Sequence, residues 1–140
     1  MSAIFNKTCT YAVQAAIYLA GQPKGKLISQ VELAERLSQP QHFLGKILQS
    51  LVKSGLIMST KGKFGGFTLA KDASKIKLIH IVHAIEGENF LEGCFLGLPQ
   101  CGGSSGCSSH IQWSKIKKQL TKLLNRNIKG LHHGFEEKLN

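Results

Sequence analysis

Two short amphipathic segments separated by only four residues constrain the fold of this chain more than any other feature. The first runs from residue 30 to about residue 37 and begins at a capping box. In that box Ser29 accepts a hydrogen bond from the backbone three residues on, and Glu32 reaches back. The spacing of its apolar residues predicts a helix that buries Val31, Ala34 and Leu37.

The second segment follows the linking residues SQPQ at 38–41. Ser38 can cap a helix there, Pro40 fits a first helical turn, and Gly55 suits the left-handed position that ends a helix. Between Pro40 and Gly55, apolar residues recur at three- and four-residue spacing: Phe43, Leu44, Ile47, Leu48, Leu51 and Val52. Two helices joined by so short a link predict a helix-turn-helix.

A β-hairpin is expected next. The stretches LIMST at 56–60 and GFTLA at 66–70 have strand character, and the glycines of the KGKFG turn between them permit a tight or bulged hairpin. A further amphipathic segment at 6–21 predicts a helix on the N-terminal side. Three helices and then a hairpin make the winged-helix arrangement, so the expected fold class is mainly α with a small β-hairpin wing.

Two more helices are expected beyond the wing, a short one within 75–87 and a long one reaching about residue 128. Apolar side chains line one side of the long helix: Trp113, Ile116, Leu120, Leu123 and Leu124. We interpret it as a dimerisation helix that packs against its own copy, and packing onto its own winged domain is the alternative. The expected division is a winged helix-turn-helix domain at 1–88, a cysteine-rich loop at 89–110, and the dimerisation helix with a tail at 111–140.

The charge of the chain favours an anionic partner. Eighteen Lys and Arg against eight Asp and Glu give a formal net charge of +10 in 140 residues, which points to nucleic acid first and an acidic membrane second. No signal peptide or run of roughly 20 apolar residues is visible, so a cytoplasmic protein is expected. No nucleophile–base pair stands out, and an enzyme is not expected.

Lysines are concentrated in the predicted helix-turn-helix and wing. Seven lysines and one acid lie between residues 46 and 77, a density that suits phosphate contacts. We expect Lys61 and Lys63 to place the wing on double-stranded DNA. The early residues of a recognition helix reach base edges, so the expected base contacts are Gln39, Gln41, His42 and Lys46.

Three of the four cysteines lie in a Gly/Ser-rich loop with a histidine behind them. Cys94, Cys101, Cys107 and His110 follow the spacing C-x6-C-x5-C-x2-H. Four such ligands are enough to close a zinc tetrahedron or to complete an iron–sulfur site. Long, glycine-rich intervals favour the larger iron–sulfur group, with zinc or unliganded redox thiols as alternatives. Cys9, within the first helix, is expected to fill apolar space.

Several stretches together resemble the Rrf2 family of bacterial winged-helix transcription regulators. They are TYAVQAAIYLA, LGKILQSLVKSGLI, STKGKFGGFTLAKDASKIKL, AIEG and the loop with three cysteines. The resemblance covers nearly the whole chain, and the wing and the cysteine loop are its most specific parts. It implies a homodimer that binds DNA through the third helix and the wing, with a cluster that modulates the binding.

The resemblance also implies a ligand set. Cys94, Cys101 and Cys107 fall on the family's cluster cysteines, and His110 falls on the histidine ligand of IscR-like members. That assignment favours a [2Fe-2S] cluster over [4Fe-4S]. NsrR-like members instead take a carboxylate ligand from the partner's first helix, and the matching residue here is Thr10.

Three further positions depart from the family pattern. The first cysteine interval has six residues where IscR-like members have five, Gly45 stands where they carry an acid, and Lys61 stands where an arginine is common. Because Gly45 lies in the third helix, the base preference of relatives does not transfer, and Lys61 cannot form the planar two-pronged contact that arginine makes.

The expected function is a homodimeric transcription regulator that binds a palindromic operator in double-stranded DNA. Its iron–sulfur cluster would sense iron–sulfur status, redox state or nitric oxide. A zinc- or thiol-controlled regulator of the same fold is one alternative. An iron–sulfur electron-transfer or cluster-carrier protein is the alternative from another class.

Overall fold

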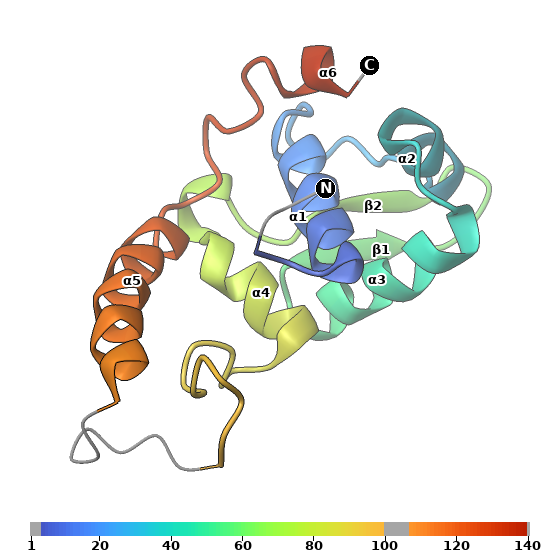
Figure 1. Ribbon diagram of the computed structural model, residues 1–140. Coiled ribbons are helices and arrows are strands. Elements are labelled where there is room, and N and C mark those ends of the chain that lie inside the picture. Colours follow the sequence, from blue (N-terminus) through green and yellow to red (C-terminus); the bar gives the residue numbers. More distant parts are fainter. Residues whose placement is uncertain (1–3, 100–106, 140) are drawn as a thin grey trace.

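The structure is a computed structural model that describes residues 4–99 and 107–139 of the chain. It is mainly helical, with one two-stranded antiparallel hairpin in the described residues (Figure 1). The expected winged-helix fold class is confirmed. The elements in chain order are α1 (Lys7–Ala20), α2 (Gln30–Leu37), α3 (Gln41–Lys53), β1 (Ile57–Thr60), β2 (Gly66–Leu69), a 3-10 turn (Ala73–Lys75), α4 (Leu78–Glu86), α5 (Ser108–Leu124) and α6 (Phe135–Lys138).

Helix α2 begins where the capping box predicted. The Ser29 hydroxyl accepts a hydrogen bond from the Glu32 backbone N–H at 3.1 Å. The predicted burial of Val31 is wrong, because its side chain is 49% exposed. The buried face consists of Leu33, Ala34 and Leu37, and Val31 lies two residues before Leu33, on the other side of the helix.

The turn between α2 and α3 differs from the expectation by two residues. Ser38 has a left-handed backbone (φ 52°) and ends α2, so it does not cap α3. Pro40 takes the capping position before Gln41 and lies outside the helix proper. At the other end of α3, Gly55 has the expected positive φ of 74°, which a residue without a Cβ adopts without strain.

The hairpin pairs Ile57 with Leu69 at its base and Thr60 with Gly66 near its tip. A third segment joins it, because Ile28 and Phe67 exchange two backbone hydrogen bonds of 3.0 and 2.8 Å. The residues before α2 therefore hold β2 in place. The wing is fixed to the same body that carries the helix-turn-helix.

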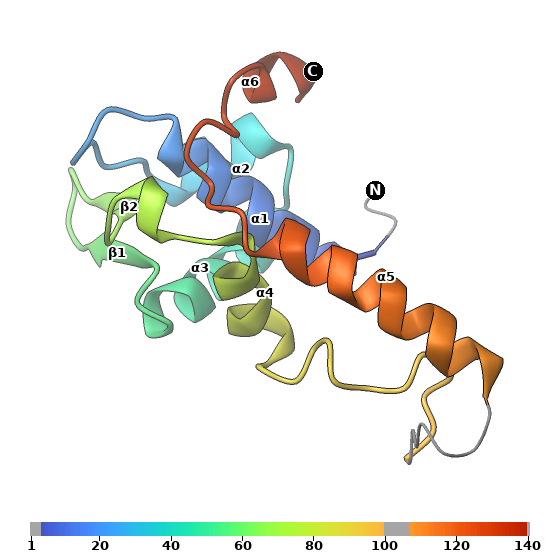
Figure 2. The same cartoon turned by 90° about the vertical axis from the view of Figure 1, so that its left-hand side faces the viewer.

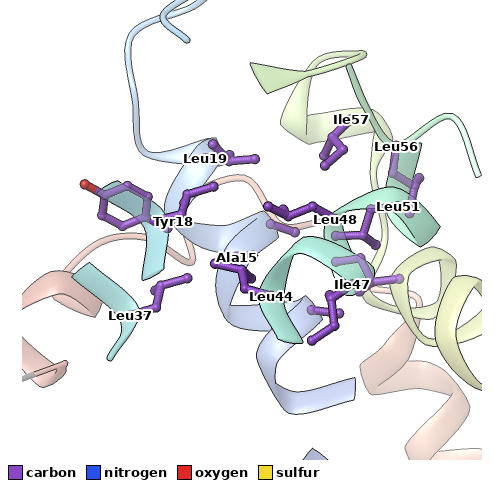
Figure 3. Packing of buried hydrophobic residues seen from close by; sticks show 14 of the residues in the cluster. Ala15, Tyr18, Leu19, Leu37, Leu44, Ile47, Leu48, Leu51, Leu56 and Ile57 are labelled. Atoms are coloured by element: carbon purple, nitrogen blue, oxygen red, sulfur yellow. The ribbon is translucent and has the colours of Figure 1, made fainter. Parts of the chain in front are cut away.

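The core lies between α1 and α3 (Figure 3). Helix α1 contributes small side chains, Ala12, Ala15 and Ala16, all buried. Helix α3 buries one face made of larger ones: Leu44, Ile47, Leu48 and Leu51. Small residues on one helix allow large residues on the other to approach closely, so this packing fixes which face of α3 remains in solvent.

The chain beyond α5 returns to this core. The Leu78 N–H donates to the Arg126 carbonyl at 3.0 Å, and the Ile128 N–H donates to the Ile76 carbonyl at 2.9 Å. Ile128 is fully buried in the main core, and α5 ends at Leu124, four residues before the expected end. The segment predicted for dimerisation, 111–140, thus supplies a core residue to the winged domain.

We predict that Ile128→Ala destabilises the folded protein by about 2–5 kcal/mol, because it leaves a cavity in the main core. Val31→Ala, on the exposed face of α2, is the matched control and should change the free energy of unfolding by about 0.5 kcal/mol or less. Urea unfolding followed by circular dichroism measures both. Equal effects of the two substitutions would show that the C-terminal segment does not contribute to the core.

Candidate nucleic-acid interface and cysteine site

The solvent face of α3 presents polar and basic side chains. Gln41, His42 and Lys46, three of the predicted base contacts, are all exposed. Gln49 and Lys53 continue this face toward the C-terminal end of the helix. Sequence reasoning missed the last two, although their spacing from His42 and Lys46 places them on the same side of a helix.

Gln39, the fourth predicted contact, lies elsewhere. Its side chain is only 5% exposed, and its Nε2 donates to Gln14 Oε1 of α1 at 3.0 Å. The turn between α2 and α3 is therefore tied to α1 by a buried amide pair. In this structure Gln39 positions the start of α3 and does not lie on its exposed face.

Helices α2 and α3 approach closely at Gly45. The Gln30 Nε2 donates to the Gln41 carbonyl at 2.9 Å, which links the first turns of the two helices. A Cβ at Gly45 would lie 2.7 Å from this Gln30 Nε2. The absence of a side chain at Gly45 leaves room for the Gln30 link, a physical reason for the departure from the acidic residue of the IscR-like pattern.

The wing tip has a backbone that only glycine fits. The Gly65 N–H donates to the Gly62 carbonyl at 3.0 Å, and a Cβ at Gly65 would overlap the Thr60 carbonyl oxygen. The side chains at this turn, Lys61, Lys63 and Phe64, are exposed. Both predicted phosphate contacts thus project from a well-defined hairpin.

A groove joins the recognition helix to the wing. It has a volume of about 560 Å³ and lies between Gln49 and Lys53 of α3, Thr60 and Lys61 of the hairpin, and Gln30 of α2. No acidic residue occurs between Glu35 and Asp72 in the sequence. Lys53 and Lys61 are the charged residues of the groove lining, which holds no acid, so the groove itself carries positive charge, as suits a polyanion.

Cys94 is held against the first half of α5 by Trp113. The indole Nε1 donates to the Gly93 carbonyl at 3.1 Å, and the Phe95 ring packs on the indole with centroids 5.7 Å apart. Gly93 and Phe95, the residues on either side of Cys94, thus both contact the Trp113 side chain. The Cys94 sulfur also accepts a hydrogen bond from the Leu96 N–H at 3.4 Å, the kind of bond that stabilises ligating sulfur.

Cys107 and His110 lie at the start of α5. Cys107 is exposed and occupies the capping position before the helix. The His110 N–H donates to the Cys107 carbonyl at 3.1 Å, and Trp113 follows one turn later. Figure 2 shows α5 extending away from the body, with this first turn farthest out.

Cys101, the remaining predicted ligand, lies outside the described residues. Within residues 4–99 and 107–139, no three His, Cys, Asp or Glu side chains are gathered closely enough to hold a metal ion. The donors that are described nevertheless suit a soft metal centre. Cys94 lies on the N-terminal side of the loop, and Cys107 and His110 lie on its C-terminal side at α5. The Leu96 N–H already points at the Cys94 sulfur.

Cys9 is separate from this group. It is fully buried against Val82 of α4 and Leu124 of α5, as an apolar filler would be. Burial raises the pKa of its thiol from 9.0 to about 12, and the Glu86 carboxylate adds to the shift. Cys9 therefore stays protonated in the folded protein.

Helix α5 uses only part of its apolar side within the chain. Leu124 is buried, and Leu120 and Trp113 are half-buried. Ile116 and Leu123, seven residues apart and so on one face, are 55% and 52% exposed. The described residues leave this face uncovered.

No helix among the described residues is long and apolar enough to cross a membrane.

Comparisons with known proteins agree with this arrangement. Residues 5–128 match the family model Rrf2, described as an iron-dependent transcriptional regulator. An HTH-type transcriptional regulator of Aquifex aeolicus is 34% identical over 119 residues, 84% of this chain and 82% of the relative. The HTH-type transcriptional regulator IscR of Escherichia coli is 30% identical over 115 residues, covering 82% and 70% of the two chains. The chain belongs to the Rrf2 family.

Solved structures show the same fold. The IscR of T. potens has a TM-score of 0.74 at 25% identity and covers 96% of this chain and 89% of its own. CymR, the global cysteine regulator of B. subtilis, has a TM-score of 0.77 at 18% identity and covers 92% and 95%. As a member of this family the chain is a DNA-binding transcription regulator. Membership thus favours a regulator over the electron-transfer or cluster-carrier alternative.

The contrast between Cys9 and the loop cysteines gives a prediction. In a Cys94→Ser/Cys101→Ser/Cys107→Ser variant, Cys9 should not react with a maleimide in native buffer and should react fully in concentrated guanidinium. The wild-type protein, freed of metal, should react rapidly at Cys107. The measurement is mass spectrometry of the labelled protein. Fast native labelling of Cys9 would show that its side chain is not buried.

The same pKa shift predicts how stability depends on pH. Folding raises the pKa of Cys9, so its contribution to stability is complete below pH 9.0 and declines as the pH rises toward about 12. A Cys9→Ala variant should lack this part of the alkaline decline. The free energy of unfolding at a series of pH values measures it.

Proposed function

We propose that this chain is a homodimeric repressor or activator whose DNA affinity depends on an iron–sulfur cluster. The ligands are Cys94, Cys101, Cys107 and His110. The observation that carries the proposal is the attachment of Gly93 and Phe95 to Trp113, because it brings the first ligand toward the helix that starts with the last two.

On DNA, α3 enters the major groove and the wing contacts the backbone or the minor groove. Gln41, His42 and Lys46 reach base edges from the exposed face of α3. Lys61 and Lys63 meet phosphates from the wing. Gln39 supports this contact indirectly, since its bond to Gln14 sets where α3 begins.

The homodimer forms through α5. Its uncovered face, Ile116 and Leu123, is continuous with apolar residues already packed on the same protomer. A two-fold axis through this contact relates two recognition helices, so the operator has two half-sites in inverted order.

The cluster residues suit [2Fe-2S] better than [4Fe-4S], because three thiolates and one imidazole would complete the set, as in IscR-like relatives. When bound, such a cluster supplies a centre that changes with iron supply, oxidation or nitric oxide. The chain's own part is to hold the loop against Trp113 and to donate the Leu96 N–H to the Cys94 sulfur.

A route from the loop to the recognition helix runs through the second buried cluster. Cys9 of α1, Val82 of α4 and Leu124 of α5 pack together there, and α1 also carries the alanines against which α3 packs. If metal ligation in the loop shifts α5, the shift therefore acts on α1, the helix against which α3 packs. Coupling of this kind requires two states that differ in DNA affinity.

A thiol-controlled regulator is the second candidate. It is favoured by the exposure of Cys107, which leaves its sulfur open to oxidants without any metal. The fold is shared with CymR, the global cysteine regulator of B. subtilis. The same fold with zinc in place of iron differs only in the metal found on analysis.

For the cluster we predict that protein purified without oxygen is coloured and contains iron and acid-labile sulfide. Cys94→Ala, Cys101→Ala and Cys107→Ala should each lose both, and His110→Ala should weaken retention and shift the visible spectrum. Cys9→Ala is the control and should keep them. Colourless wild-type protein with stoichiometric zinc, or with no metal even after reconstitution, would favour the second candidate instead.

For the dimer we predict that Leu123→Glu yields a monomer, because a carboxylate cannot be buried unpaired in an apolar contact. Thr121→Glu introduces the same charge two residues earlier, at an exposed position on a different face of α5, and should remain dimeric. Sedimentation velocity separates the two species. A dimeric Leu123→Glu would remove this face from the interface.

A further inference from the structure

We propose that Phe64, at the tip of the wing, is itself a DNA contact that inserts its ring into the minor groove. The proposal rests on the proposed DNA binding and extends it to an apolar contact at the wing. Phe64 is 86% exposed, the largest exposed fraction among the exposed large hydrophobic residues in the described part of the chain. A phenyl ring left in water forgoes its favourable transfer free energy, which a partner that covers it would recover.

The backbone around Phe64 is rigid. The turn is closed by the hydrogen bond from Gly65 to Gly62, and a side chain at Gly66 would collide with the Ile28 backbone. Phe67, three residues further on, shows the contrast, because its ring packs against the main core. The hairpin thus uses one phenylalanine to hold itself to the body and presents the other outward.

The charges around the ring select an anionic partner. Lys63 lies with its Nζ 5.7 Å from the ring centroid, Lys61 is exposed in the same turn, and no acid occurs between Glu35 and Asp72. An apolar ring with one ammonium group beside it, in a turn that carries a second lysine, suits a ligand with phosphates next to an apolar or stacked interior. A duplex offers this at its minor groove, where two phosphate backbones flank the sugars and base steps.

Phe64 lies at the edge of the groove between α3 and the wing. Residues on both sides of it in the sequence, Gly62 and Gly65, line that groove. A duplex with its major groove on α3 passes its neighbouring minor groove under a wing of this kind. Apolar side chains inserted at such points partly unstack a base step, and flexible pyrimidine–purine steps yield most easily.

The test uses duplexes recovered by the wild-type protein from a random-sequence pool, with affinities measured by fluorescence anisotropy over a range of salt concentrations. Phe64→Ala should weaken binding by roughly 10- to 100-fold, the equivalent of one buried phenyl group. It should leave the salt dependence unchanged. Lys63→Ala should weaken binding and reduce the slope of log K against log salt by about 0.9. Phe64→Leu should keep most of the affinity.

Two controls separate this effect from a loss of structure. Thermal unfolding of Phe64→Ala should match that of wild type, because Phe64 makes no contact with the core clusters of the described residues. Ile111→Ala removes another exposed apolar side chain, from α5, the helix that extends away from the body carrying β1 and β2 in Figure 2, and should leave DNA affinity unchanged.

The outcomes distinguish a DNA contact by Phe64 from DNA binding by the protein as a whole. If Phe64→Ala binds as wild type does while Lys63→Ala binds more weakly, the wing contacts the backbone only and the inference about Phe64 is overturned. DNA binding by the wing would survive that result. If the wild-type protein enriches no duplex from the pool, with or without cluster, both the proposed function and the inference about Phe64 are contradicted.

Discussion

The packing of one face of α3 on the alanines of α1 determines how this molecule can meet DNA. Leu44 and Leu48 are fully buried there, so the opposite face of α3, with His42 and Lys46, remains exposed to solvent. The bond from Gln39 to Gln14 fixes the turn that precedes α3, and the pairing of Ile28 with Phe67 fixes the wing beside it. Recognition helix and wing therefore present one rigid basic surface, which lowers the entropy lost on binding.

The cysteine site depends on a comparable device at the other end of the molecule. Trp113 joins the stretch around Cys94 to α5 by a hydrogen bond and a ring contact. The loop is long and rich in glycine, so without such an attachment the conformational entropy lost in ordering its cysteines would be larger. The buried cluster at Cys9 connects the base of α5 to α1. The two ends of the molecule are thereby joined through packed side chains.

Local chemistry made most of the fold predictable from sequence. Apolar periodicity and the capping Ser29 marked the helices, and the glycines marked the hairpin. What failed depended on contacts distant in sequence. Val31 and Leu33 offer α2 two possible apolar faces, and only the surrounding helices select the second. The burial of Gln39 needs Gln14, and the burial of Ile128 needs the chain to return after α5. The spacing of the cysteines and His110 is visible in the sequence, and their role as ligands stays a prediction, whereas the contact of Trp113 with Gly93 could be found only from the fold.

We infer that metal ligation in the loop changes the affinity of the dimer for DNA. This is tested by the dissociation constant of one preparation for its selected duplex, measured with the cluster present and after its anaerobic removal. We expect the two constants to differ by about 5- to 150-fold, the usual range for coupled sites, and expect Cys107→Ala to show one affinity under both conditions. Equal affinities of the loaded and cluster-free wild-type protein would contradict this inference.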